Sequence, residues 1–203
     1  MARDLRPKHK LCRRFGEKLC DSVKCPVKRR SYPPGIHGPQ KKSNKKVSAY
    51  GKQLLEKQKV KRIYGILERQ FSNYVTEASR KKGDTGKFLV EMLESRLDTV
   101  IFRLGLVSTR PAARQAVGHG HFMVNGRRVT IPSLRVKIGD LITLRERSRK
   151  SPLFASATER LAKFEAPGWL DLDKKNLSAK VLNAPTLEDA NFNIKPIIEF
   201  YSR

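Results

Sequence analysis

The sequence has 203 residues, enough for one substantial domain or two small ones with a hydrophobic core. Its 44 Lys and Arg residues outnumber 19 Asp and Glu, and the resulting net charge of +25 calls for a polyanionic partner, by default a nucleic acid. No run of about 18 apolar residues is present, which excludes a membrane-spanning helix, and an odd number of cysteines argues against a disulfide scaffold.

The positive charge is concentrated at the N-terminal end. Residues 1–62 carry a net charge of +16, residues 63–150 carry +9, and residues 151–203 carry zero. Residues 1–46 show no sustained hydrophobic period and form a basic arm. A solvated, disordered tail is the alternative interpretation, but rigid turns and metal-type residues in the arm argue against it.

All three cysteines lie in the arm, where His9, Cys12, Cys20 and Cys25 follow the spacing His-x2-Cys-x7-Cys-x4-Cys. Three thiolates and an imidazole are a ligand set of closed structural zinc sites. An iron–sulfur cluster is an alternative, although the imidazole favours zinc, and three free buried cysteines are another. Because the arm has little core of its own, we expect one structural zinc ion to order it.

Apolar residues step by three and four from Val60 to Ala78, which predicts one amphipathic helix. We interpret this stripe as core, with RNA stacking on its aromatic rings as the alternative. The opposite face carries basic side chains: Lys57, Lys61, Arg62 and Arg69.

A second helical pattern runs from Phe88 to Leu104, and Gly105 is well placed to end it. Ser108 is placed to cap a short helix that has Pro111 at its third position.

Beyond this helix the period changes to two. Strands at 122–124 and 127–129 flank Asn125-Gly126, a strong signal for a two-residue hairpin. Two more strands are expected at Val136 and at 141–144. Further on, the sequence predicts a short helix over 156–165 and short strands or packing segments at 169–172 and 197–200.

Several segments match a known family in order and spacing. They are Glu56-Lys57-Gln58-Lys59-Val60, Arg62-Ile63-Tyr64-Gly65, Glu68-Arg69-Gln70-Phe71, Leu93-Glu94-Ser95-Arg96-Leu97-Asp98, Arg103-Leu104-Gly105, Ala113-Arg114-Gln115, Gly118-His119-Gly120-His121-Phe122, Val124-Asn125-Gly126-Arg127 and Ile198-Glu199-Phe200-Tyr201-Ser202-Arg203. Through them the chain resembles, nearly end to end, the bacterial form of the universal small-subunit ribosomal protein S-four. Some bacterial members carry four cysteines in the arm, and here His9 takes the first position, which indicates a zinc-site-containing subtype.

The resemblance implies an α+β fold. A mainly helical domain is expected to contain an inserted S-four-type RNA-binding module, built from two helices and a β-hairpin, and to follow the metal-pinned N-terminal arm. The implied boundaries are 1–46 for the arm, 47–93 for the first part of the helical domain, 94–154 for the RNA-binding domain, and 155–203 for the C-terminal part of the helical domain, with short strands.

The resemblance also implies a function and partners. Members of this family bind small-subunit ribosomal RNA, nucleate assembly of the subunit body, lie near the messenger-RNA entry, touch protein S-five and influence translational accuracy. A cytoplasmic, non-enzymatic constituent of the small ribosomal subunit is therefore expected. The neutral C-terminal end, with Trp169, Phe200 and Tyr201, is where we expect protein contacts.

The residue pattern itself supports RNA binding. Arg110 and Arg114 stand four apart on one face of a short helix, and a guanidinium matches two phosphate oxygens. A merely solvated basic face is the alternative, as are local hydrogen bonds for the two histidines and a mobile linker for the lysine run. The predicted RNA-binding residues are Arg13, Arg14, His37, Lys41, Lys42, Lys45, Lys46, Lys57, Lys61, Arg62, Arg69, Arg110, Arg114, His119, His121, Arg127 and Arg128.

Two other functional classes match parts of the sequence. Ser95-Arg96-Leu97-Asp98 resembles the core of the pseudouridine synthase motif, with Asp98 as nucleophile, but no separate catalytic domain fits in the rest of the chain. We expect Asp98 to pair instead with Arg96 or Arg103. A zinc-containing DNA-binding regulator is disfavoured, because no recognition helix follows the His/Cys cluster at finger spacing.

Overall fold

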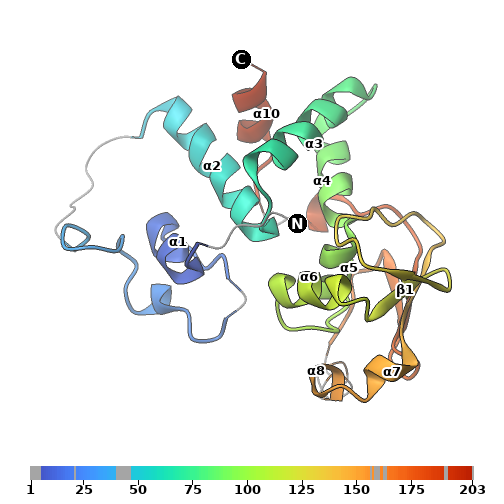
Figure 1. The fold of residues 1–203 in the computed structure, drawn as a ribbon. Helices are drawn as coiled ribbons and strands as arrows, with labels where there is room; N and C mark the ends of the chain where they lie inside the picture. Colours follow the sequence, from blue (N-terminus) through green and yellow to red (C-terminus); the bar gives the residue numbers. More distant parts are fainter. Residues whose placement is uncertain are drawn as a thin grey trace. The chain divides into compact units, whose positions relative to one another are not determined.

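The computed structural model describes residues 6–20, 22–39, 47–155, 157, 161, 164–189 and 192–202 (Figure 1). The chain forms two compact units. The first consists of Met1–Gly86 together with Asn191–Arg203, and the second consists of Lys87–Ala190.

The arm of the first unit contains two short helices, α1 (Lys8–Phe15) and the 3-10 helix η1 (Pro26–Lys28). Its small core consists of the three cysteines, against which Leu19 and Val27 pack. The predicted lysine run at 41–46 lies outside the described residues.

Two helices follow the arm where the sequence predicts a single one. Helix α2 (Ala49–Tyr64) ends at Gly65, which adopts a left-handed conformation with φ 63°, and α3 (Glu68–Arg80) begins three residues later. The prediction of one continuous helix is therefore wrong. The apolar stripe continues across the turn because Ile66 is buried between the two helices, with 1% of its surface exposed.

The chain returns to the first unit as α10 (Lys195–Tyr201), which packs against α2 (Figure 1). Ile197 is fully buried, and the rings of Phe71 and Tyr201 lie 6.1 Å apart. Residues 197–200 are therefore helical and not a strand. The reason is that Pro196 occupies the first turn, where its fixed φ suits a helix and its missing N–H costs nothing.

The second predicted helix is also divided, into α4 (Thr85–Glu94) and α5 (Leu97–Arg103). Between them Arg96 is extended, with φ −64° and ψ 133°, and forms an isolated bridge to Arg135. Gly105, at φ 71°, lies just beyond the end of α5, as predicted.

The sequence predicts Ser108 as the cap of helix α6 (Arg110–Gly118), but the cap is Thr109. The Thr109 Oγ1 accepts a hydrogen bond of 3.3 Å from the amide of Ala112, so Pro111 occupies the second helical position.

A five-stranded antiparallel sheet completes the second unit, in the order β2-β1-β3-β5-β4. Its strands are β1 (Phe122–Val124), β2 (Arg127–Val129), β3 (Leu141–Leu144), β4 (Leu170–Asp173) and β5 (Ser178–Val181). The predicted hairpin is present, with φ 51° at Asn125 and 75° at Gly126. Val136, expected in a strand, is instead a buried residue whose amide donates to the Ser95 carbonyl at 2.9 Å.

The second unit extends further along the chain than the predicted module of 94–154. Strand β5 pairs with β3, with Ile142 opposite Ala179, and so brings the segment after residue 154 into the same sheet. Only residues 191–203 of the predicted C-terminal part belong to the first unit.

Short helices complete the second unit: α7 (Glu146–Arg149), α8 (Pro152–Ala155) and the 3-10 helix η2 (Leu187–Asp189). The helix predicted over 156–165 lies mostly outside the described residues, although Ala157 and Leu161 are described and buried in the core.

Candidate nucleic-acid interface and metal centre

Two arginines are fixed on the backbone where α6 leads into β1. The Arg128 Nη2 donates to the carbonyl of His119 at 3.2 Å, and the Arg145 Nη1 donates to the carbonyl of Gly120 at 3.3 Å. Gly120 has φ 72°, and a Cβ added there would collide with the Arg128 guanidinium. The glycine therefore permits both the turn and the close approach of the arginine.

His121 lies beneath this turn. Its Nδ1 is 2.9 Å from the Ser148 hydroxyl, and its ring meets the Phe154 ring edge-on at 5.6 Å. Burial lowers the pKa of His121, and Coulombic interactions with His119, Arg145 and Arg128 lower it further. Desolvation by burial is the largest of these causes, and the two arginines add positive charge beside the ring, which suits an anionic partner.

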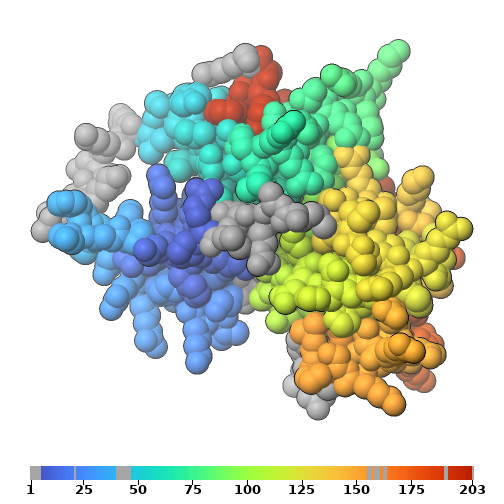
Figure 2. Space-filling model, in the orientation of Figure 1, coloured from blue at the N-terminus to red at the C-terminus, as the bar shows by residue number. Residues whose placement is uncertain are grey.

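The run 145–150, which follows β3, adds basic residues outside the predicted RNA-binding set. Arg147, Arg149 and Lys150 are exposed, and the Arg149 Nη2 donates to the Asn176 carbonyl at 2.8 Å. Four basic residues among six were the available signal. We call the following residues the basic face: His119, Arg127, Arg128, Arg145, Arg147, Arg149 and Lys150. The chain segment that carries them, 119–150, is coloured green-yellow to orange in Figure 2.

Arg114 is part of a buried ion-pair cluster. The Arg96 side chain is fully buried and forks onto the Asp98 carboxylate at 3.0 and 2.7 Å, while the Arg114 Nη1 reaches the same carboxylate at 3.2 Å. The predicted pairing of Asp98 with Arg96 is confirmed, whereas Arg103 pairs with Glu94 at 2.7 and 2.8 Å.

Arg110, four residues before Arg114, holds its guanidinium carbon 4.3 Å from the centre of the Phe102 ring. This contact is close enough for a cation–π interaction, and it fixes the arginine against α5.

Lys57 and Lys61 are used inside the first unit and not on its surface, which corrects their assignment to an exposed RNA-binding face. Both ammonium groups pair with Glu68, at 2.8 and 2.5 Å, and their side chains are 8% and 6% exposed. Although burial raises the pKa of Glu68, hydrogen bonds from both lysines and from the Tyr201 hydroxyl outweigh it and lower that pKa to about 2. Arg69 is exposed and Arg62 is half-buried.

The predicted RNA-binding residues of the arm also include one that binds protein groups and others that are exposed. Arg13 donates to the carbonyls of Tyr32 at 3.1 Å and Pro33 at 3.3 Å, and its guanidinium carbon lies 4.8 Å from the centre of the Tyr32 ring. This clamp holds the proline-rich turn, while Arg14 and His37 are exposed. The four predicted lysines at 41, 42, 45 and 46 lie outside the described residues.

The arm also brings a group of metal-type ligands together. The ligand atoms of His9, Cys20 and Cys25 all lie within 4.8 Å of one another, and Cys12 is buried in the same cluster. Burial raises the pKa of Cys12 to about 11. Burial also raises the pKa of Cys25, but hydrogen bonds from the Val27 amide and from the other two thiols outweigh it and leave that pKa below its usual value.

Comparison with known proteins identifies two family domains within residues 3–142. Residues 3–94 match the family described as "Ribosomal protein S4/S9 N-terminal domain", and residues 95–142 match the "S4 domain". The small ribosomal subunit protein uS4 of Ruminiclostridium cellulolyticum is 49% identical over 211 residues, with full coverage of both chains. The chain belongs to the uS4 family. Two further uS4 proteins, from Heliobacterium modesticaldum and a Geobacter species, are 47% and 49% identical, again with full coverage.

Membership of the uS4 family confirms the resemblance and the α+β fold, and it settles the question of catalysis. The relatives are ribosomal structural proteins, so the chain is a structural protein and not an enzyme. Asp98, the candidate nucleophile, is held by two arginines. No helix in the described ranges is long and apolar enough to cross a membrane.

Proposed function

We propose that this protein is a structural constituent of the small ribosomal subunit and that its basic face binds small-subunit ribosomal RNA. The observation that carries the proposal is the pair of guanidiniums, Arg128 and Arg145, anchored on consecutive carbonyls. Within the described part of the chain neither arginine forms a salt bridge. Their remaining N–H groups are therefore held in place and available to phosphate oxygens.

Ribosomal RNA is the nucleic acid that this surface suits best. Folded RNA is recognised largely by its shape and by backbone contacts, for which several fixed arginines on one unit are appropriate. Membership of the uS4 family supports the same partner. Exposed basic residues of the arm, such as Arg14, extend the proposed contact.

The test is footprinting on a small-subunit ribosomal RNA transcript across a salt series. Specific binding predicts protection at one multi-helix junction that survives moderate salt. Uniform protection that disappears as salt rises would contradict the proposal.

Finer parts of the proposal rest on the family. They are a cytoplasmic location, nucleation of subunit-body assembly, proximity to the messenger-RNA entry, contact with ribosomal protein S-five and a contribution to translational accuracy. Binding of the purified protein to protein-free small-subunit RNA would test the assembly role, because a nucleating protein must bind before the others.

We further propose that the arm holds one zinc ion through Cys12, Cys20, Cys25 and His9. The donor set fits, because it offers three thiols and one imidazole, and three of these ligand atoms already lie close together. A bound zinc ion would act structurally, by cross-linking an arm whose own core is three cysteines and two apolar neighbours.

Metal analysis of the purified protein tests this site. The expected result is about one zinc ion per chain, since four ligands complete one tetrahedral site. Iron with acid-labile sulfide would assign the site to the alternative cluster, and the absence of both metals would refute the proposal.

A further inference from the structure

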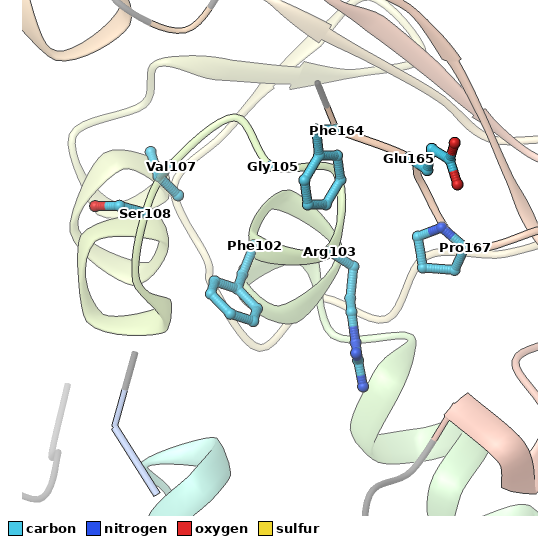
Figure 3. Close-up of a pocket in the computed structure, with 8 residues that line it drawn as sticks. All are labelled: Phe102, Arg103, Gly105, Val107, Ser108, Phe164, Glu165 and Pro167. Carbon is cyan, nitrogen blue, oxygen red and sulfur yellow. The ribbon is translucent and has the colours of Figure 1, made fainter. Parts of the chain in front are cut away.

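The second unit contains a cavity that the basic face does not use. Its volume is about 420 Å³, and its walls include the rings of Phe102 and Phe164 and the side chains of Val107 and Pro167. Figure 3 shows both rings at the cavity, with the Glu165 carboxylate pointing away from them. The walls are therefore mainly apolar and aromatic.

The two rings are held in place by different neighbours. Phe102 comes from α5, where the Arg110 guanidinium carbon lies 4.3 Å from its ring centre. Phe164 lies against Gly105, and a Cβ added to that glycine would come within 2.8 Å of the ring. Both phenylalanines are half-buried although they flank the main core, so each ring keeps accessible surface.

We infer that this cavity accepts one unpaired base of the bound ribosomal RNA, stacked on Phe102 or Phe164. The inference rests on the proposed RNA-binding function. Unpaired RNA bases are recognised by stacking on aromatic rings, and every base offers a flat face for it. The stated volume accommodates a planar base, and the Glu165 carboxylate is turned away from the rings.

Charge distinguishes a nucleotide from an apolar side chain of a partner protein. Arg110 does not line the cavity, but it places a cation against Phe102, one of the two rings that do. A base carries its phosphate with it, and that phosphate gains from an adjacent guanidinium, whereas a leucine or phenylalanine of another protein does not.

The first experiment is zero-length ultraviolet cross-linking of the unmodified protein to a small-subunit ribosomal RNA transcript, followed by mass spectrometry of the peptides. A nucleotide adduct on Phe102 or Phe164 is expected. Adducts confined to other residues would overturn the inference.

The second experiment compares Phe164→Leu with Phe88→Leu, which makes the same change at a half-buried phenylalanine outside the lining of the cavity. Phe164→Leu is expected to weaken binding to the transcript about fivefold or more, with an unchanged salt slope because no phosphate contact is lost. Phe88→Leu is expected to bind normally, and circular dichroism checks that both variants fold.

The two experiments separate the inference from the function on which it rests. Unmodified protein that fails to bind the transcript saturably would refute the proposed function. Normal binding by Phe164→Leu, without adducts at either ring, would refute the cavity as a base site and leave the RNA-binding face intact.

Discussion

At the scale of single residues, the basic side chains of this protein have two distinct uses. Arg96 and Lys57 pair with carboxylates inside the protein, whereas Arg128 and Arg145 are anchored by carbonyls and keep N–H groups available. The sequence shows which residues are basic, but it does not show which of them bind groups within the protein. The difference lies in whether a carboxylate is nearby, and such partners are often distant in the chain.

The buried Arg96 is expected to be essential for the stability of the second unit. Arg96→Met leaves the Asp98 carboxylate, 6% exposed, with a weaker set of partners and should cost about 3–5 kcal/mol in the free energy of unfolding. Arg114→Met is the control, because Asp98 then keeps its two hydrogen bonds from Arg96. Urea denaturation measures both, and equal losses would contradict the assignment.

Arg128→Gln is expected to reduce the affinity for small-subunit ribosomal RNA and to flatten its dependence on salt. Loss of one phosphate contact lowers the slope of log K against log salt by about one. Arg80→Gln, at an exposed arginine that ends α3, removes the same charge and should leave the slope nearly unchanged. Filter binding at several salt concentrations provides the measurement, and equal slopes in the two variants would exclude a specific contact.

At the scale of elements, the periodicity of the sequence predicts which residues are buried but not where the helices stop. The stripe from Val60 to Ala78 is mostly core, although Gly65 divides it. The break at Arg96 carries no glycine or proline and arises from a bridge to Arg135, a long-range partner that local patterns cannot reveal. The hairpin at Asn125-Gly126 was predictable because its turn depends only on those two residues.

Gly65 offers a direct test of the break between α2 and α3. Its φ is 63° and an added Cβ would meet nothing within 4 Å, so Gly65→Ala should destabilise the protein by about 1–2 kcal/mol through the backbone alone. Gly118→Ala, in the last turn of α6 and equally unobstructed, has an ordinary φ and should stabilise slightly. Thermal unfolding compares them, and shifts of the same sign would contradict the argument.

The contact among α2, α3 and α10 should make stability depend on pH. The Glu68 pKa of about 2 lies below its unfolded value, so this group contributes stability above the unfolded pKa and loses it as pH falls toward 2. Glu68→Gln is expected to reduce that acid dependence, whereas Glu188→Gln, an exposed change of equal charge, should not. Urea unfolding from pH 6 to pH 2 measures it, and parallel profiles would refute the role of Glu68.

At the scale of the whole molecule, the basic residues behind the net charge of +25 lie on parts of the chain that have very different cores. The arm has a core of three cysteines with two apolar neighbours, whereas the second unit has a continuous core and a five-stranded sheet. The family and the α+β class were accessible from the sequence, because motifs keep their order and spacing. The extent of the second unit was not, since it depends on the pairing of β5 with β3.

Removal of the proposed zinc ion should therefore affect the arm alone. A strong chelator is expected to make residues 1–46 sensitive to protease. The reason is that the free energy of zinc binding would contribute to the folding free energy of the arm. The second unit serves as the internal control and should remain resistant. Mass spectrometry of the fragments distinguishes the two, and unchanged cleavage of the arm after confirmed metal loss would contradict the prediction.

The first unit is assembled from both ends of the chain, which sets the order in which the nascent protein can mature. Glu68 lies 133 residues before Tyr201, the residue whose hydroxyl donates to it at 2.8 Å. At a translation rate of about 5–20 residues per second, this partner arrives about 7–27 s later. Residues 87–190 lie between the two, so nearly all of the second unit is synthesised before α10 can complete the first.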